Sequence, residues 1–151
     1  MSKDMLPANE ITELLKGAPV GYLGLAKDEV PYVIPINFAY DSGNIYLHCA
    51  REGRKIDYLK VNRRACFYSG EIGGLVAADS PCKHSFSYRS VIIEGHMEEV
   101  TIFVEKEAAL RAITAKYAGP VQAKKPLGDG AIDAVKVFRL VPLSMSGKKS
   151  P

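Results

Sequence analysis

Short runs of apolar residues, separated by turn-forming residues, follow one another along most of the chain. The clearest example lies between Pro31 and Ala50, where an apolar run is followed by the polar segment Asp-Ser-Gly-Asn at positions 41–44. In the run after this turn, every second residue is apolar, with Ile45 and Leu47 on one face and Tyr46, His48 and Ala50 on the other. Two runs joined by a short loop with a glycine predict a β-hairpin.

Other strands and helices are predicted from the same kind of pattern. Strands are expected over 20–26, from 65–68 on toward 75–76, over 88–100 with a break at Gly95, and over 134–145. Helices are expected at three places: after a cap at Asn9 with an end at Gly17, around Ile56 and Leu59, and over 105–117 with an ion pair between Glu107 and Arg111. Many short strands with few helices favour a small antiparallel barrel covered by helices, a mainly β fold with α elements.

Three details of this fold are open to a direct check. Pro35 interrupts the first strand of the hairpin, and a proline cannot donate to a strand ladder. It therefore predicts an edge strand, a bulge or the point where two sheets part. Cys66 falls in an apolar run and is expected in the core, and positions 119–130 are expected to form a long loop.

Length and composition are those of an ordinary globular protein. The chain has 151 residues, which suits a single domain over 1–151. Its net charge of +3 is small and its basic residues are scattered, which argues against nucleic-acid binding. No apolar run reaches the roughly 20 residues that a membrane helix needs, and the first ten residues lack the apolar centre of a signal peptide.

The cysteines and the missing nucleotide motifs narrow the function further. The three cysteines form no Cys-x-x-Cys pair, so reduced thiols in the cytoplasm are expected. Cys82 and His84 are separated by one residue, too close for the usual zinc spacing, and a third partner for nucleophilic chemistry is missing. No metal site is predicted. The absence of a Gly-x-Gly-x-x-Gly motif excludes a Rossmann oxidoreductase.

Two candidate groups for ligand chemistry lie next to each other in the sequence. Arg54 and Lys55 follow Gly53 at the start of the short predicted helix. Cations oppose the helix dipole at this end, so the pattern makes sense if an anion docks there; a solvated basic turn is the alternative. His48 ends the preceding strand and is either a structural residue or part of a site.

The same stretch resembles a known family. It contains Tyr-x-x-Pro-x-x-Phe-x-Tyr at 32–40, Gly-x-Ile-Tyr-x-His-x-Ala at 43–50 and Gly-Arg-Lys at 53–55. These motifs, with Tyr-x-Ser-Val at 88–91 and a terminal Gly-Lys at 147–148, resemble the FMN-binding split-barrel proteins related to pyridoxamine 5′-phosphate oxidase. Within them, the similarity points to the branch of nitroimidazole-resistance proteins. The resemblance implies a split β-barrel that binds FMN as a homodimer, with the cofactor at the interface.

The resemblance also implies which residues meet the cofactor. These are Pro35, Ile36, Asn37, His48, Ala50, Gly53, Arg54, Lys55, Arg89, Ser90, Val91 and Lys148. Arg54 and Lys55 would hold the FMN phosphate, and His48 is the candidate catalytic residue, as a flavin contact, a proton donor or a hydrogen-bond partner of the substrate. Arg89, Ser90 and Lys148 are candidate contacts from the second subunit.

Two functions follow from the resemblance. The first is an FMN-dependent oxidoreductase that takes electrons from a reduced nicotinamide and passes them to a small electrophile such as a nitroaromatic compound. The second is a non-catalytic module that binds FMN, F420 or haem. The chain departs from pyridoxamine 5′-phosphate oxidase itself, because the family's Arg-x-x-x-Leu-Lys and its C-terminal Arg-x-His are missing. The oxidase activity itself is therefore not expected.

Overall fold

The computed structural model describes residues 4–150 and consists of one antiparallel sheet with helices packed around it. The helical elements are α1 (Ala8–Gly17), α2 (Arg54–Val61), α3 (Phe103–Ala118), α4 (Pro120–Ala123) and the 3-10 turn η1 (Pro81–Lys83). The strands are β1 (Asp4–Met5), β2 (Gly21–Lys27), β3 (Val30–Ile36), β4 (Ala39–Asp41), β5 (Asn44–Cys49), β6 (Arg64–Val76), β7 (Ser85–Glu99) and β8 (Lys136–Ser150).

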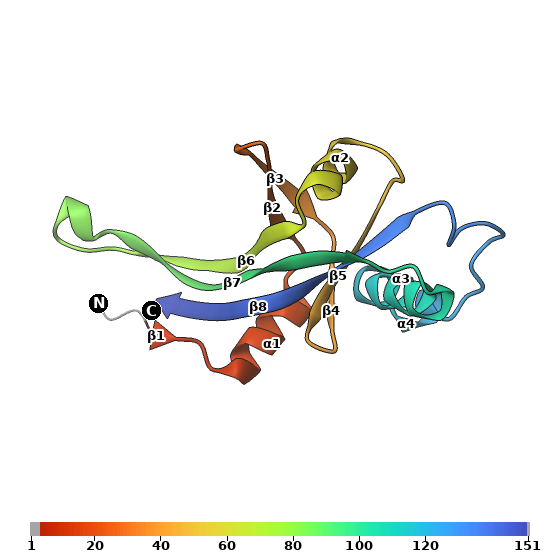
Figure 1. Cartoon of the computed structure of the whole chain (residues 1–151). Helices are drawn as coiled ribbons and strands as arrows, with labels where there is room; N and C mark the ends of the chain where they lie inside the picture. The colour runs from red at the N-terminus through yellow and green to blue at the C-terminus, as the bar shows by residue number, and fades with distance from the viewer. Residues whose placement is uncertain (1–3, 151) are drawn as a thin grey trace.

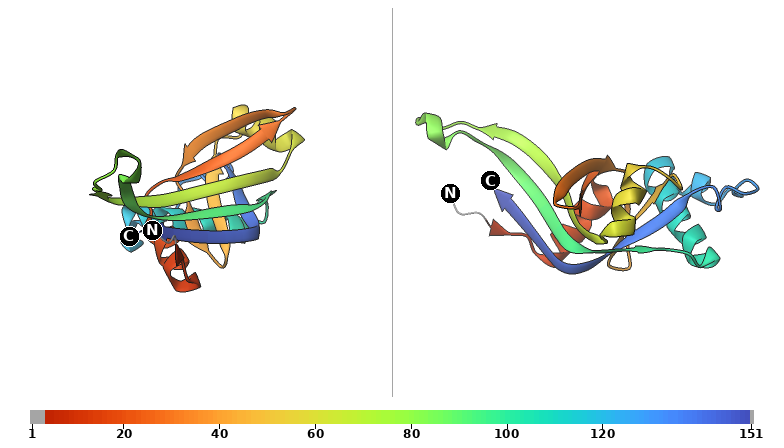
Figure 2. Two further views of the ribbon diagram at one scale, coloured as in Figure 1. Left: turned by 90° about the vertical axis from the view of Figure 1, so that its left-hand side faces the viewer. Right: turned by 45° about the horizontal axis from the view of Figure 1, so that its top comes forward.

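The strands follow the order β3-β2-β6-β7-β8-β5-β4, and β1 pairs with the end of β8. The sheet curls around the core as a split barrel, with α1 on one side and α3 near β4 and β5 (Figures 1 and 2). The predicted antiparallel barrel with flanking helices is therefore confirmed. Within residues 4–150, no helix is both long enough and apolar enough to cross a membrane.

Strands β6 and β7 are longer than the barrel needs. Residues 71–76 of β6 and 85–89 of β7 form an arm with η1 at its tip, and β8 pairs only with its last two residues, Tyr88 and Arg89 (Figure 1). The pairing shifts between Ile72 and Leu75, and both side chains are mostly exposed. We call residues 71–89 the arm.

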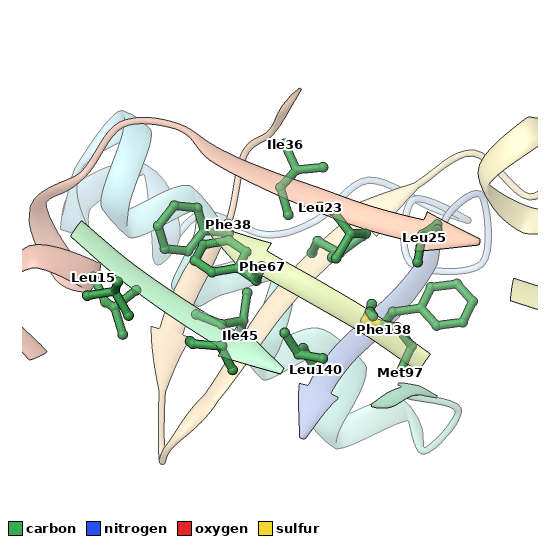
Figure 3. Close-up of a cluster of buried hydrophobic side chains, with 14 of the residues drawn as sticks. Leu15, Leu23, Leu25, Ile36, Phe38, Ile45, Phe67, Met97, Phe138 and Leu140 are labelled. Carbon is green, nitrogen blue, oxygen red and sulfur yellow. The ribbon is translucent and has the colours of Figure 1, made fainter. Parts of the chain in front are cut away.

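The core is a continuous apolar cluster inside the curled sheet. Its fully buried members include Leu23, Phe38, Ile45, Phe67 and Leu140 (Figure 3). The rings of Phe38 and Phe67 meet edge to face, with centroids 4.9 Å apart, a preferred arrangement of aromatic pairs. The alternation seen in the sequence explains this core, because Ile45 and Leu47 of β5 both point inward and are fully buried.

The predicted hairpin is correct only in its second half. β4 and β5 do form a hairpin across Ser42 and Gly43, both with positive φ. The apolar run before them is two strands, because β3 pairs with β2 over its whole length and the chain leaves the ladder after Ile36. β3 ends the strand order, so the prediction of an edge strand at Pro35 is confirmed.

Two further sequence predictions are wrong. Asn9 does not cap α1, because the amide of Ile11 already bonds to the carbonyl of Pro7, so the helix begins one residue before Asn9. Cys66 is exposed, because its neighbours Ala65 and Phe67 point into the core and alternation turns Cys66 outward. The loop expected at 119–130 contains the short helix α4, and the pair Glu107–Arg111 is present at 2.8 Å.

Candidate functional site

A hollow of about 340 Å³ lies where β3 ends, β5 ends and α2 begins. It is lined by Val20, Pro35, Ile36, Asn37, His48 and Lys55. Five of these six were predicted from the sequence as cofactor contacts, although they come from three separate segments. The structure therefore brings Pro35, Ile36, Asn37, His48 and Lys55 together around one space.

Local packing positions each wall of this hollow, which we call the strand-end pocket. The β2–β3 ladder stops at the pair Gly21–Ile36, so Val20 and Asn37 lie just beyond its end. On β5, burial of Leu47 turns the next residue, His48, to the opposite face. On α2, Ile56 and Leu59 are buried, which leaves Lys55 at the rim.

The charges in the pocket are arranged so that His48 is neutral. Burial, and then the ammonium group of Lys55, lower the pKa of His48 below its ordinary value of 6.5. At neutral pH the imidazole therefore has one N–H donor and one nitrogen acceptor. Lys55 supplies the positive charge of the pocket, and His48 supplies a neutral hydrogen-bonding group.

Arg54 lies beside Lys55 and is held by two aromatic rings. Its guanidinium carbon is 4.3 Å from the centroid of the Tyr32 ring and 5.6 Å from that of Tyr58. Such stacking orients a guanidinium group while its N–H groups stay available at the edges. Within residues 4–150, no carboxylate forms an ion pair with Arg54 or Lys55.

The start of α2 adds main-chain donors to these cations. Gly53 precedes the helix with φ of 135°, and no side chain caps the first turn. The first N–H groups of a helix have no partner within the helix and favour an anion. Two cations without a carboxylate partner at such a helix start form a site suited to a phosphate group. Ala50 lies in the exposed link between β5 and α2 and does not line the pocket.

The remaining predicted contacts lie on β7 and β8, away from the pocket. Ser90 pairs with Gly70 on one side and with Lys148 on the other. Neighbouring strands are about 4.8 Å apart, so Ser90, three strands from Asn37 and Pro35, is about 14 Å away across the sheet. Neither Ser90 nor Lys148 is among the residues that line the strand-end pocket in one copy of the chain.

Arg89 and Val91 do not share the outward direction of Ser90. The guanidinium of Arg89 lies 2.7 Å from the carboxylate of Glu71 and 3.8 Å from that of Glu13 on α1. The side chain of Val91 is fully buried in the core. Val91 could therefore meet a ligand only through its main chain, and Arg89 is already paired with acidic groups.

Comparison with known proteins identifies the family of the chain. The family described as Pyridoxamine 5′-phosphate oxidase matches residues 7–149, almost the whole chain. The chain belongs to this family. Among curated proteins, none matches the chain.

Solved structures similar to this family member include three with related names. A candidate 5-nitroimidazole antibiotic resistance protein from Bacteroides thetaiotaomicron has 28% identity and a TM-score of 0.82, covering 98% of this chain and 87% of its own. The flavocytochrome Anf3 from Azotobacter vinelandii has 23% identity and a TM-score of 0.85, covering 96% and 68%. The FAD and heme binding protein from Mycobacterium smegmatis has 22% identity and a TM-score of 0.89, covering 99% and 74%. The last two show the shared fold.

Sequence reasoning missed three residues of this family member's site. Val20 lines the pocket, and Tyr32 and Tyr58 hold Arg54. The spacing of Arg54 and Tyr58, four residues apart on one helix, could have indicated their contact. Val20, just before β2, and Tyr32 on β3 are distant in sequence from α2, and no local pattern marks them.

Proposed function

We propose that the protein binds FMN in the strand-end pocket and acts as an oxidoreductase on a small electrophilic acceptor. The observation that carries this proposal is one hollow lined by the end of an edge strand, by His48 in its neutral form and by Lys55, with Arg54 next to Lys55 at the start of α2. A reduced nicotinamide is the proposed electron donor and a nitroaromatic compound the proposed acceptor. The 28% identity with a candidate nitroimidazole-resistance protein supports the acceptor class.

The residues present fit the parts of FMN. Arg54, Lys55 and the amides after Gly53 suit a phosphate, with which charge-assisted hydrogen bonds are strong. The segment 35–37 lies at the end of an edge strand, where main-chain groups are free to meet the polar rim of a flat heterocycle. Structures with flavin in their names share this fold, which is further support.

When bound, the flavin supplies the electron-transfer chemistry, and the protein supplies orientation and electrostatics. In this proposal His48 donates or accepts one hydrogen bond at the acceptor, which its neutral imidazole can do at physiological pH. Lys55, beside it, stabilises negative charge in the pocket. In this proposal His48 affects turnover more than cofactor retention.

We further propose that the protein is a homodimer in which each copy completes the site of the other. The outer face of the sheet carries a row formed by Pro35, Tyr22, Tyr68, Ile92 and Ser146 on successive strands. The three middle side chains are 44%, 41% and 45% exposed, a large fraction for apolar groups on one face. Packing two such faces about a twofold axis would carry Ser90 and Lys148 of one copy toward the pocket of the other.

The absorption spectrum of the protein as purified tests the cofactor. Bands typical of oxidised flavin are expected, with FMN released on denaturation. Loss of these bands with a reduced nicotinamide, and their return when a nitroaromatic compound is added without oxygen, would support the enzyme. A haem spectrum would favour the binding module, and a colourless protein that takes up no added flavin would contradict the cofactor proposal.

Sedimentation of flavin-loaded and flavin-free protein across a dilution series tests the dimer. Because a ligand held by both subunits links binding to association, FMN should strengthen the dimer and raise its melting temperature. A monomer that keeps its flavin, or a dimer constant indifferent to flavin, would contradict the shared site.

A further inference from the structure

Tyr117, near the end of α3, joins the two main-chain segments that flank the strand-end pocket. Its hydroxyl accepts a hydrogen bond from the amide of Phe38 at 3.1 Å and donates one to the carbonyl of Pro19 at 2.8 Å. Pro19 immediately precedes the lining residue Val20, and Phe38 immediately follows Asn37. A side chain of α3 therefore holds both flanks of the pocket.

The register of the ladder shows what this hydroxyl replaces. The β2–β3 pairing ends with Gly21 opposite Ile36. If the same register continued, Val20 would oppose Asn37 and Pro19 would oppose Phe38. A direct bond between the amide of Phe38 and the carbonyl of Pro19, about 2.9 Å long, is the bond that such a pair would form. The hydroxyl of Tyr117 stands between these two groups instead.

Proline at position 19 makes this arrangement stable. Because proline has no N–H group, the pair Pro19–Phe38 could form only one of the two bonds of a ladder pair. The hydroxyl exchanges that single bond for two, one to each strand. The strands stay apart at this point, and the residues between the last ladder pair and the hydroxyl, Val20 and Asn37, line the hollow.

Contacts around Phe38 hold its amide next to the hydroxyl of Tyr117. The Phe38 ring is fully buried against Phe67 (Figure 3). The ammonium group of Lys116 lies 3.5 Å from the centroid of the same ring and bonds to the carbonyl of Leu15 at 3.4 Å. Phe38 therefore cannot turn away, and the position of its amide is set by the ring on one side and by Tyr117 on the other.

We propose that Tyr117 is a positioning residue whose hydroxyl keeps the end of the β2–β3 ladder open, so that the ring of the flavin can enter between Val20 and Asn37. Without the hydroxyl, the amide of Phe38 and the carbonyl of Pro19 close on each other and the pocket narrows. This inference rests on the proposed flavin site, and it assigns to α3, outside the pocket lining, control over the pocket's shape.

The variant Tyr117→Phe tests the proposal in the full-length protein. FMN and riboflavin affinities, measured by quenching of flavin fluorescence, should both fall about tenfold, because entry of the flavin ring would have to break the new bond between Phe38 and Pro19. The equal loss matters because a change at Arg54 and Lys55 affects only the ligand with a phosphate. The melting temperature of the flavin-free variant should stay close to that of the wild type, since the closed ladder regains a bond.

Tyr40→Phe is the matched control. Tyr40 packs against the same core, and within residues 4–150 its hydroxyl forms no hydrogen bond. The control should leave flavin affinity and melting temperature unchanged. A Tyr117→Phe variant that melts much earlier but binds flavin normally when folded would reduce Tyr117 to a structural role and overturn the proposal.

Hydrogen exchange at the Phe38 amide separates this inference from the flavin proposal. In the flavin-free protein, the Phe38 amide of Tyr117→Phe should stay protected from exchange, because it closes onto the carbonyl of Pro19. In the flavin-loaded variant, the absorption bands of the bound flavin should shift. If the wild-type protein binds no flavin, the cofactor proposal fails. The exchange measurement still tests whether the hydroxyl of Tyr117 keeps the end of the β2–β3 ladder open. Loss of all protection at Phe38 in the variant would show that the ladder does not close, and the proposed role of the Tyr117 hydroxyl would be wrong.

Discussion

The strand-end pocket and the arm each contain a hollow of about 340 Å³, yet their chemistry is different. The arm hollow is lined by cations that already have partners, with Arg89 on Glu71 and Lys149 on Glu10. The pocket has Lys55, beside Arg54, with no carboxylate paired to either in the part of the chain that the structure describes. Size alone does not distinguish the two hollows; the state of their charges does.

The construction of the two regions differs as well. The arm is a two-stranded extension whose contacts are mostly between its own strands, and it exposes Ile72, Leu75 and Phe86. The pocket joins segments that are far apart in sequence, and its residues are fixed by buried neighbours. A preorganised site needs such fixed groups. Exposed apolar side chains on an extension are instead typical of a surface that another molecule covers.

The largest expected effect is at the two cations that begin α2, Arg54 and Lys55. The double variant Arg54→Ala, Lys55→Ala should weaken FMN binding about a hundredfold, because two charge-assisted contacts to phosphate are lost. Riboflavin, which has no phosphate, should bind almost as before. Isothermal titration with both ligands measures the difference.

The control for this double variant removes two nearby cations that do not line the pocket. Lys60→Ala with Arg64→Ala makes the same change in net charge, and both side chains are exposed near the end of α2. This control should leave FMN affinity within about threefold of the wild type, since long-range attraction between exposed charges is screened by salt. An equal loss in both double variants would mean that net charge, and not a phosphate site, governs binding.

His48 is expected to have the next largest effect. His48→Ala should lower the turnover of a nitroaromatic acceptor about tenfold, which is less than the roughly hundredfold or more of a full proton-transferring group, because His48 supplies one hydrogen bond in this proposal. FMN should remain bound. Because burial and Lys55 lower the pKa of His48, activity that needs the neutral imidazole should persist below pH 6.5 and fall only at more acidic pH. Steady-state rates from pH 5 to 8 measure this.

His48→Asn provides the comparison, because an amide also donates and accepts hydrogen bonds but does not titrate in this range. It should recover part of the rate and remove the acidic fall that belongs to the imidazole. Unchanged kinetics in His48→Ala across several acceptors would make His48 a structural residue.

More of the residues that line the pocket could be predicted from the sequence than of the residues that hold them in place. The reason is that the holding contacts join residues far apart in the sequence. Alternation in 45–49 and the three-residue spacing of Ile56 and Leu59 are local signals, and both elements formed as expected. The grouping of Pro35–Asn37 with His48 and Lys55 came from a family resemblance, since no local rule joins three separate segments. The stacking of Arg54 on Tyr32 and the bridge made by Tyr117 depend on tertiary packing alone.

The errors have equally specific causes. Cys66 was assigned to the core from the apolar character of its run, whereas alternation within β6 decides which side faces inward. The pattern of the apolar run at 31–40 predicts one strand of a hairpin. The run breaks at Asn37 and Phe38, where the amide of Phe38 bonds to the hydroxyl of Tyr117 on α3 and the ladder has ended. A contact with a residue almost 80 positions away cannot be inferred from the run itself.

A smaller effect is expected at Lys116, beside the pocket. Burial lowers the pKa of its ammonium group from 10.5 to about 8. The unfolded chain therefore binds more protons between pH 8 and 10.5, and the stability of the folded protein rises with pH across this window. Lys116→Met should stabilise the protein at pH 7 by about 1 kcal/mol, a value reduced for partial exposure to solvent.

Thermal unfolding of the wild type and of Lys116→Met at pH 7 and pH 10 checks the direction of this pH dependence of stability. The advantage of Lys116→Met should shrink at pH 10, where the wild-type lysine is already neutral in the folded state. Lys16→Met, at an exposed position of α1, is the control and should show no such dependence on pH. A variant less stable than wild type at pH 7 would mean that the contact with the Phe38 ring outweighs the cost of burial.

The smallest effect is expected at Arg89 on the arm, and it tests the contrast between paired and unpaired cations directly. Removing its side chain in Arg89→Ala breaks contacts with Glu71 and Glu13, both partly exposed. Exposed ion pairs contribute little, so the free energy of unfolding should fall by less than about 1 kcal/mol. FMN affinity should be unchanged, because Arg89 is already neutralised and lies on the opposite face of β7 from Ser90. Chemical denaturation and an FMN titration measure the two quantities. If Arg89→Ala weakened FMN binding more than about threefold, the arm cation would belong to the cofactor site, and pairing would no longer separate the two hollows.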